Sequence, residues 1–323
     1  MGLKKRTEVG IALVIVLLVI TVLVGLTIEL TRATRFTYRR SSLLSEGIKL
    51  SYIARSGFYG ACALLVDDRN NYDALTESWA KAEVFSRESE SFFKRGSFVV
   101  RIEDELGKIP INKLVAGNGY NQAVKELLIR LLGQPEFKLD QGKINEIVDS
   151  IKDWLDKDDE VTGSGAESNY YRSLAKPYSP KNGVLDCLDD LLMVKGITRT
   201  LFYGSKDTPA LRDYLTVYGE GMVNINTAPP LVLRALGKEV SLSFVEEMVA
   251  YRLQEGVDLS RADWFRNLPG AENVHFDYPF LGVKSDYFTI TSIGTLGKMR
   301  KRIVASVKRT GGKTVELLSW VEE

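Results

Sequence analysis

The chain has 323 residues, of which 45% are hydrophobic, and its 43 basic and 42 acidic side chains leave a formal net charge of +1. This composition is sufficient for the buried cores of about two domains and excludes a disordered or fibrous chain. Because its charges are balanced, the chain lacks the positive electrostatic field that is typical of nucleic-acid-binding proteins. Two cysteines, Cys62 and Cys187, are too few for a disulfide scaffold, and they are either paired with each other or two separate thiols.

The first predicted element is an apolar helix close to the N-terminus. Residues 11–28 hold no ionisable group, and their length approaches the ~20 residues that an α-helix needs to cross the hydrocarbon of a bilayer. A removable secretory signal would more often have a shorter apolar region followed by a small-x-small cleavage site, for which residues 30–33 are a poor candidate. We therefore predict a membrane-spanning segment at residues 11–30.

Basic residues flank this segment on both sides. Lys4, Lys5 and Arg6 precede it and favour a cytoplasmic N-terminus. The arginines that follow it favour the opposite orientation, with the C-terminal side in the cytoplasm: Arg32, Arg35, Arg39 and Arg40. A short prefix before a following part of about three hundred residues favours a small inner tail and a large translocated domain.

After the span, the helix is predicted to continue as a stem to about Val66. Apolar residues recur there at three- and four-residue intervals, which is typical of one helix face packed on a folded domain. They form two sets: Leu43, Leu44, Ile48 and Tyr52, then Ala54, Phe58, Cys62 and Leu65.

The C-terminal part predicts the sheet on which this helix packs. Three β-rich stretches, at residues 286–293, 301–308 and 314–321, are separated by glycine-bearing turns at 294–297 and 311–312 and indicate an antiparallel meander. Residues 97–103 form a further predicted strand far upstream. The sheet is therefore split by an insertion, whose pattern is mainly helical.

The insertion contains an internal echo. Residues 107–112 and 221–226 share the frame Gly-x-apolar-x-Ile-Asn, and each leads into a helical segment. Asn112 and Asn226 are predicted N-caps or turn formers, because the side chain of asparagine can satisfy backbone donors at a helix start. We interpret the echo as a repeated turn without chemistry of its own.

Carboxylates are crowded at the end of one predicted helix and in the loop after it. Numbering from Asp156 as position 1 gives the ligand spacing of an EF-hand loop, with Asp158, Glu160, Thr162, Ser164 and Glu167 at positions 3, 5, 7, 9 and 12. Position 6 is Val161 instead of glycine, and residues 168–172 do not resemble an exiting helix, so we predict a calcium loop of another kind. The alternative is a solvated acidic loop, since charge runs usually face water. Further candidates for this site or a second one are Asp186, Asp189 and Asp190.

The sequence offers no catalytic constellation. His275 is the only histidine, so a histidine-based zinc centre is excluded, and no nucleophile elbow accompanies it. The chain also lacks a complete dinucleotide fingerprint and a phosphate-binding P-loop. We predict that the protein is not an enzyme, that it has no catalytic residues and that His275 lies in a loop.

Short motifs stand in a fixed order along nearly the whole chain. They are the region around Gly10 at residues 6–18, YDALTESWA at 72–80, EDELGKIPIN at 103–112, DWLDKDD at 153–159, VNINTAP at 223–229, SDYF at 285–288, and Trp320. Together these motifs resemble the K-type minor pseudopilins of bacterial type II secretion systems (GspK-like). The resemblance implies a structural protein at the tip of the pseudopilus, which starts or caps the filament together with I- and J-type minor pseudopilins and helps to export folded proteins across the outer membrane.

The resemblance also implies how the N-terminus is processed. A prepilin peptidase would cut after Gly10, which makes Ile11 the mature, methylated N-terminus. Ile15 then occupies the fifth mature position, where most pilins carry glutamate. A carboxylate inside a bilayer is energetically costly and tends to need a charged partner from a neighbouring subunit. A subunit without this glutamate needs no such partner, which is in keeping with a place at the tip. Ile15 as one more lipid-facing residue is the simpler alternative.

The family further implies an α+β fold, in which a pilin-like transmembrane and stem helix packs on a small antiparallel β-sheet that carries a large inserted helical domain. The expected divisions are a leader at 1–10, a transmembrane segment at 11–30, a stem at 31–66, a pseudopilin domain at 67–109 and 284–323, and a helix-hairpin-helix or SAM-like insertion at 110–283. The chain would cross the inner membrane once, with its C-terminal domain in the periplasm. One or two calcium ions are implied in the insertion, and the residues of the matching segment are Asp156, Asp158, Asp159 and Glu167.

A membrane-anchored DNA receptor is the alternative function. Residues 223–231, 246–252 and 262–270 also resemble helix-hairpin-helix repeats of such receptors. Residues 221–270, however, hold five basic and six acidic side chains, a balance of 5 − 6 = −1. Because DNA affinity rests largely on neutralising phosphates, we expect no nucleic-acid binding.

Overall fold

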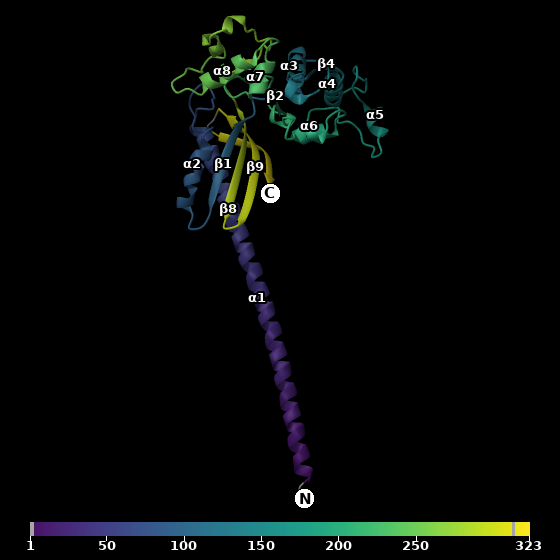
Figure 1. The fold of residues 1–323 in the computed structure, drawn as a ribbon, viewed down its shortest axis with the longest axis vertical. Helices are drawn as coiled ribbons and strands as arrows, with labels where there is room; N and C mark the ends of the chain where they lie inside the picture. The colour runs from purple at the N-terminus through teal and green to yellow at the C-terminus, as the bar shows by residue number, and fades with distance from the viewer. Residues whose placement is uncertain (1–2, 312–313) are drawn as a thin grey trace.

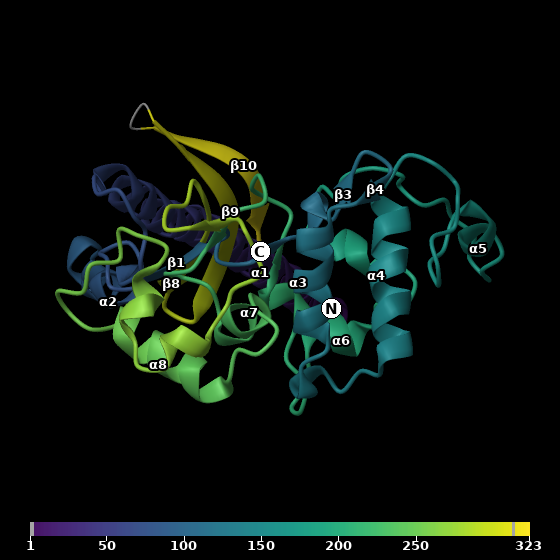
Figure 2. The same ribbon diagram turned by 90° about the horizontal axis from the view of Figure 1, so that it is seen from above.

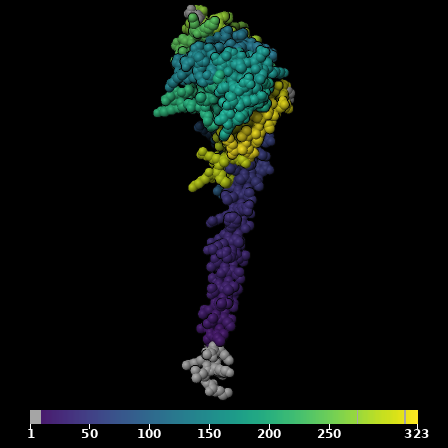
Figure 3. Space-filling model, turned by 90° about the vertical axis from the view of Figure 1, so that its right-hand side faces the viewer, coloured from purple at the N-terminus to yellow at the C-terminus, as the bar shows by residue number. Residues whose placement is uncertain are grey.

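The computed structural model describes residues 3–311 and 314–323, so the first two residues of the predicted leader and Gly312 of a predicted turn lie outside the described residues. One helix, α1 (Leu3–Asp67), forms a rod with a folded head at its far end (Figures 1 and 3). The head consists of a sheet that packs on the last turns of α1 and an insertion that lies beyond the end of the sheet.

The N-terminal part of α1 matches the requirements of a lipid environment. All residues from 10 to 45 are exposed, and α1 is long and apolar enough to cross a membrane. The hydroxyls of Thr21 and Thr27 donate hydrogen bonds of 2.8 Å to the carbonyls of Leu17 and Leu23 one turn earlier. The helix thereby satisfies its own side-chain polar groups, as a segment surrounded by hydrocarbon must.

The stem confirms only half of the predicted packing face. Ala54, Phe58 and Leu65 are buried, but the first predicted set is wrong, because Leu43, Leu44, Ile48 and Tyr52 are all exposed. The head covers α1 only from about Leu50, the first buried residue of the stem, so Leu43, Leu44 and Ile48 precede the covered part. Tyr52 lies on the side of the helix opposite the buried face. The observed buried face is Leu50, Ile53, Ala54, Phe58, Ala61 and Leu65.

The sheet has four antiparallel strands in the order β1-β8-β9-β10, which confirms the split sheet and the C-terminal meander. They are β1 (Ser97–Asp104), β8 (Tyr287–Leu296), β9 (Met299–Thr310) and β10 (Thr314–Glu322). The first turn lies at Gly297, which has a φ of +61°, and Gly294 belongs to β8 instead of the predicted turn. A Cβ at Gly294 would lie 2.9 Å from the backbone nitrogen of Ala54, so glycine there permits close contact between sheet and stem.

Two short helices protect the free edge of β1. The segment α2 (Ala82–Ser86) followed by the 3-10 helix η1 (Arg87–Phe92) packs along this strand. Ser89 Oγ donates to the Phe98 carbonyl at 2.8 Å and accepts from the Phe98 amide at 2.9 Å, and Ser86 Oγ accepts from the Val100 amide at 3.0 Å. These hydroxyls replace a neighbouring strand, which blocks edge-to-edge pairing at these positions.

The insertion consists of two halves that lie side by side above the sheet (Figure 2). The first half contains β2 (Ile109–Pro110), η2 (Ile111–Lys113), β3 (Val115–Ala116), β4 (Gly119–Tyr120), α3 (Gln122–Leu132), η3 (Pro135–Phe137), α4 (Gln141–Leu155), α5 (Ser168–Arg172), η4 (Leu188–Met193), α6 (Arg199–Tyr203), η5 (Leu211–Asp213) and β5 (Leu215–Thr216). The second contains β6 (Val223–Asn224), α7 (Pro230–Ala235), α8 (Leu242–Arg252), η6 (Trp264–Asn267), η7 (Ala271–Asn273) and β7 (Leu281–Gly282).

The sequence echo marks the start of each half. β2 pairs in parallel with β5, and β6 pairs in parallel with β7, so each half begins and ends on the same two-stranded element. Asn112 Nδ2 donates to the carbonyls of Leu185 and Val217, at 3.0 and 2.9 Å. Asn226 Nδ2 donates to the Leu259 carbonyl at 3.0 Å, and its Oδ1 accepts from Trp264 Nε1 at 2.8 Å.

Of the two predicted roles, N-cap is wrong for both asparagines, whereas Asn226 does lie in a turn. The N-caps of the α-helices that follow are Asn121 for α3 and Pro229 for α7. Asn112 and Asn226 instead tie the start of each half to segments far along the chain. Their amides can do so because an asparagine side chain both donates and accepts hydrogen bonds.

A buried polar cluster joins the insertion to the sheet where the chain leaves β1 and returns to β8. Asp104 Oδ2 accepts from Asn224 Nδ2 at 2.9 Å, from Ser285 Oγ at 2.6 Å and from the hydroxyl of Thr227, and its Oδ1 accepts from the Leu106 amide at 2.7 Å. Burial raises the pKa of Asp104, and these donors oppose the rise. We call Asp104, Asn224, Thr227 and Ser285 the junction cluster.

Asp104→Ala should destabilise the head by about 3 kcal/mol, because it leaves several buried donors without an acceptor. Urea unfolding of the detergent-solubilised chain, followed by circular dichroism, measures the change. Asp207→Ala removes an exposed carboxylate of the insertion and should change the free energy of unfolding by less than about 0.5 kcal/mol. Equal stability of the two variants would contradict the role of the junction cluster.

Candidate metal centre in the insertion

The acidic loop lies between two helices. α4 begins at the N-cap Asp140, whose side chain accepts from the Lys143 amide at 2.9 Å, and ends at Leu155. The loop then runs from Asp156 to Glu167, and α5 begins at the next residue. Our expectation that residues 168–172 are not a helix was wrong, since these residues form a short helix held by the edge-to-face contact of Tyr171 with Trp154, at 5.2 Å between ring centroids.

Three of the predicted ligands come together. Asp156, Asp158 and Glu167 each offer a carboxylate oxygen within 4.8 Å of the others. They occupy positions 1, 3 and 12 of the loop, and the side chains of Asp156 and Glu167 are almost fully buried. Asp156 follows directly on the last turn of α4, and Glu167 directly precedes α5, so the two helix ends set their separation.

Unsatisfied oxygens within this group fit a bound cation. Asp156 Oδ1 and both carboxylate oxygens of Glu167 are buried and accept no hydrogen bond. Burial, together with the nearby charges of Asp153, Asp156 and Asp159, raises the pKa of Glu167 to about 8. Because buried carboxylates without partners are costly, this arrangement suits a hard divalent ion that takes oxygen ligands, such as Ca²⁺.

Lys152 supplies part of the compensating charge. Its ammonium donates to the carboxylate of Asp156 and, at 2.7 Å, to Thr162 Oγ1. Burial acts against the charged form, but the pKa of Lys152 is raised by Asp156 and the other nearby carboxylates. When Asp156, Asp158 and Glu167 are all ionised, these three carboxylates and the one ammonium carry a charge of −3 + 1 = −2. A single divalent cation would neutralise it.

The other predicted residues lie outside this group of three. Asp159 is next to it: its Oδ1 accepts from the Ser168 amide at 3.1 Å, and its carboxyl also interacts with that of Glu167. Asp186 and Asp190 bind the ammonium of Lys181, at 2.6 and 3.3 Å. Asp189 Oδ1 accepts from the hydroxyl of Tyr203 at 3.0 Å.

Sequence reasoning missed two polar residues beside the loop, Lys152 and Asn182. Asn182 Nδ2 donates to the Asp158 carbonyl at 2.7 Å, and its Oδ1 is buried without a partner. The residue has a φ of +46°, a conformation that asparagine tolerates better than most residues. The Asn182-Gly183 pair is a turn signal in the sequence, but nothing in its spacing indicates that the turn returns to the acidic loop.

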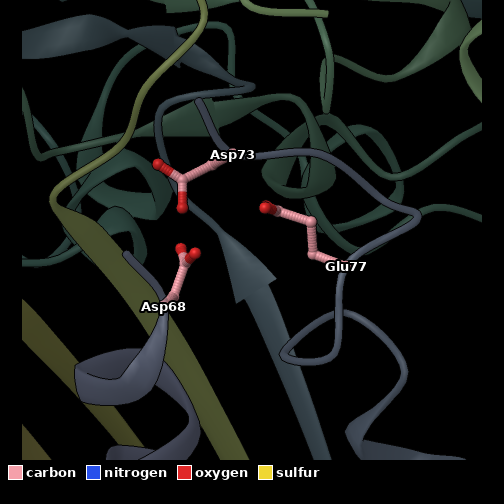
Figure 4. A group of neighbouring side chains, drawn as sticks. All are labelled: Asp68, Asp73 and Glu77. Atoms are coloured by element: carbon pink, nitrogen blue, oxygen red, sulfur yellow. The ribbon is translucent and has the colours of Figure 1, made fainter. Parts of the chain in front are cut away.

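A second acidic group lies at the end of the stem. Asp68, Asp73 and Glu77 direct their carboxylates toward one another (Figure 4). Arg309 pairs with two of its three carboxylates, at 2.7 Å from Asp68 and 2.6 Å from Asp73. Glu77 Oε2 accepts from the Ala74 amide and from Trp79 Nε1, at 2.8 and 2.9 Å. These contacts leave this group less need of a metal ion than the loop between α4 and α5.

The two cysteines are free thiols. Cys62 is half-buried in the stem, whereas Cys187 is exposed in the insertion, and the two form no disulfide. His275 lies in a loop, as predicted.

In metal-free buffer, Glu167 should make the folded chain less stable as the pH rises. Its folded-state pKa of about 8 exceeds the ordinary value of 4.5, so the folded state binds more protons than the unfolded state between these values. The free energy of unfolding should therefore fall as the pH rises through this range. Glu167→Gln, which cannot ionise, should flatten the dependence, and Glu160→Gln in the exposed part of the loop should not. Urea unfolding at both ends of the range tests this, and identical slopes for the two variants would contradict it.

Sequence-family profiles match most of the insertion. Two profiles, both described as "Type II secretion system (T2SS), protein K", match residues 107–220 and 223–284. Their division falls between β5 and β6, where the first half of the insertion ends and the second begins.

Curated relatives match over almost the whole chain. A "Type II secretion system protein K" of Aeromonas hydrophila is 26% identical and is covered over 92% of both chains. A protein of the same description from Klebsiella pneumoniae is 21% identical, with 94% of this chain and 93% of the relative covered.

A solved structure shares the fold. It comes from the crystal structure of the GspK-GspI-GspJ complex of the enterotoxigenic Escherichia coli type 2 secretion system. The match has a TM-score of 0.69 and 17% identity, and it covers 88% of this chain and 99% of the other. This likeness confirms the predicted α+β architecture.

Proposed function

The chain belongs to the type II secretion system protein K family, the K-type minor pseudopilins, and from this premise we propose that it starts or caps the pseudopilus that helps to move folded proteins across the outer membrane. The position of the insertion carries this proposal. It covers the end of the sheet that lies farthest from the membrane-spanning segment (Figure 1). A subunit stacked on that end would meet the insertion instead of a pilin sheet, so the filament would end there.

We propose that the protein is anchored in the inner membrane by residues 11–30, with the head in the periplasm, after a prepilin peptidase has cut between Gly10 and Ile11. Support comes from the long exposed helix, in which both residues are accessible. Ile15 is exposed and brings no carboxylate into the span. The mature helix would therefore enter the bilayer without needing a neighbour's charged group.

The proposed partners are I- and J-type minor pseudopilins, because the related solved structure is a complex of GspK with GspI and GspJ. A surface for such contacts lies on the stem. Ile48, Tyr52 and Tyr59 are 59%, 67% and 67% exposed and recur at helical spacing on the side turned away from the sheet. We call these three residues the stem stripe. An exposed apolar stripe is typical of a helix that packs against another helix.

Ile48→Asp combined with Tyr52→Asp should weaken assembly with the I- and J-type subunits by about tenfold or more, since aromatic anchors often dominate an interface. Co-purification of the three full-length subunits from detergent-solubilised membranes measures this. Val184→Asp, at an exposed apolar residue of the insertion, is the matched control. Failure of the unaltered chain to co-purify would contradict the proposed function, and normal assembly of the stem variant would contradict the role of the stem stripe.

We further propose that one calcium ion binds at Asp156, Asp158 and Glu167, with Asn182 near enough to assist. The ion would be structural, since it would neutralise buried carboxylates and fix the loop between α4 and α5. The unpartnered oxygens of Asp156 and Glu167 support this assignment. Asp159 is left out of the proposed ligands because its carboxylate is not among the three that approach one another within 4.8 Å.

Isothermal calorimetry of the full chain in detergent should detect Ca²⁺ binding at or below millimolar concentration, and the melting temperature should rise with Ca²⁺. Asp156→Asn combined with Glu167→Gln should abolish both effects. Asp186→Asn combined with Asp189→Asn, outside the group, should retain them. The absence of heat and of a melting shift at millimolar Ca²⁺ would refute the proposal.

The DNA-receptor alternative has little support in the second half of the insertion. Of its five basic residues, Arg252 is buried and donates to the carbonyls of Ile225 and Ala228, at 3.1 and 2.8 Å. This residue is not available for phosphates, so the accessible charge between residues 221 and 270 is more negative than the sequence count. Membership of the protein K family also favours the pseudopilin.

A further inference from the structure

Four arginines lie on one side of α1 just beyond the apolar span, within a sector of about 140° at 3.6 residues per turn. We call Arg32, Arg35, Arg39 and Arg40 the arginine collar. All four are exposed. Arg32 lies 3.1 Å from Glu29, one turn earlier, and the other three form no ion pair with any residue that the structure describes. Residues 31–45 contain these four basic side chains and no acidic one, although the whole chain has a net charge of only +1.

The position of the collar along the helix places it at a bilayer surface. At 1.5 Å per residue, Arg32 and Arg35 lie about 6 and 10 Å beyond Ile28, and Arg39 and Arg40 about 16 to 18 Å beyond it. The headgroup region extends about 5 to 8 Å past the hydrocarbon on each side. Long side chains on a helix lean toward its N-terminus, which here is the direction of the membrane. The guanidinium groups of Arg32 and Arg35 therefore reach headgroup phosphates, and the other two lie within about one Debye length of them.

Placing the arginine collar on the translocated side of the span is also unfavourable unless negative charge compensates it. Basic residues next to a span favour the cytoplasmic side, yet the collar precedes the large domain that is translocated. An anionic surface at this level would offset the cost. Phe36 and Tyr38, which are 68% and 76% exposed, lie within the collar, and aromatic side chains of this kind are enriched at membrane interfaces.

We propose that the arginine collar binds the phosphate groups of anionic phospholipids in the outer leaflet of the membrane that α1 crosses. Guanidinium groups bind phosphate through paired hydrogen bonds. The proposal rests on the membrane-spanning placement of α1. Its consequence concerns the head, because α1 is a single helix from the span to the sheet. A collar fixed at the phosphate level sets the height and tilt of the head above the membrane.

An acidic surface of a neighbouring subunit is the competing occupant. Leu50, the first buried residue of the stem, lies about 33 Å beyond Ile28 and about 15 to 27 Å beyond the collar, so the collar lies outside this chain's own head. Basic residues also occur at the lower end of the head, where Leu296 and Met299 pack near Leu50. Those residues lie well beyond the reach of headgroups and provide a matched control.

The test uses the full chain in detergent, incubated with equal parts of phosphatidylglycerol and phosphatidylcholine, and native mass spectrometry of the bound lipids. The collar variant is Arg32→Gln, Arg35→Gln, Arg39→Gln and Arg40→Gln. The control removes as many exposed charges from the lower end of the head: Lys94→Gln, Arg95→Gln, Lys298→Gln and Arg300→Gln. The leader is identical in all chains, so its basic residues contribute equally to lipid binding in each of them.

The unaltered chain and the control should retain phosphatidylglycerol in preference to phosphatidylcholine, and the collar variant should lose this preference by about tenfold or more. Replacing all four arginines by lysine should preserve most of it, because the charge remains. Equal retention of both lipids by the unaltered chain, or an undiminished preference in the collar variant, would overturn the proposal. A collar variant that keeps its lipids but no longer assembles with I- and J-type subunits would assign the arginines to a protein partner instead. Loss of all lipid adducts from every chain would instead contradict the membrane-spanning placement of α1.

Discussion

The head depends on a single buried carboxylate at the point where the chain passes between sheet and insertion. Asp104 ends β1, and its oxygens accept from Asn224 in the insertion and from Ser285 just before β8. Asn224 also donates to the Asp73 carbonyl, and Asp73 pairs with Arg309 of β9. Stem end, sheet and insertion therefore meet in one hydrogen-bonded network. Because a buried polar network costs stability unless all its members are paired, it permits only one placement of the insertion.

This constraint lets a small sheet carry an insertion of more than half the chain. Each half of the insertion closes on its own pair of parallel strands, and Asn112 and Asn226 hold the distant loops of each half. The halves therefore bring their own cores, and only the junction cluster must be aligned with the sheet. The insertion therefore lies at the end of the sheet farthest from the N-terminal end of α1, and this position is the basis of the proposed capping role.

Local patterns predicted the elements well and the long-range contacts poorly. The alternation of residues 97–103 and of the C-terminal stretches was enough to predict β1, β8, β9 and β10, because a half-buried strand repeats every two residues. The stem periodicity does not show which side of the helix faces the sheet, so it predicts a buried Tyr52 when this side chain is exposed. In the acidic loop, spacing indicates Asp156, Asp158 and Glu167, and the four-residue separation of Lys152 from Asp156 is also a local pattern. Asn182, in contrast, joins only through the fold. A side chain brought in by tertiary structure leaves no periodic signal in the sequence.

The account as a whole requires that α1 stays with the mature protein as its membrane anchor while the short polar prefix is removed. Only then does a single helix link the bilayer, the stem stripe and the head. Mass spectrometry of the N-terminus of the chain extracted from membranes tests this most directly. The account predicts a mature protein that begins at a methylated Ile11. An intact Met1, or a soluble chain trimmed downstream of Leu30, would contradict it.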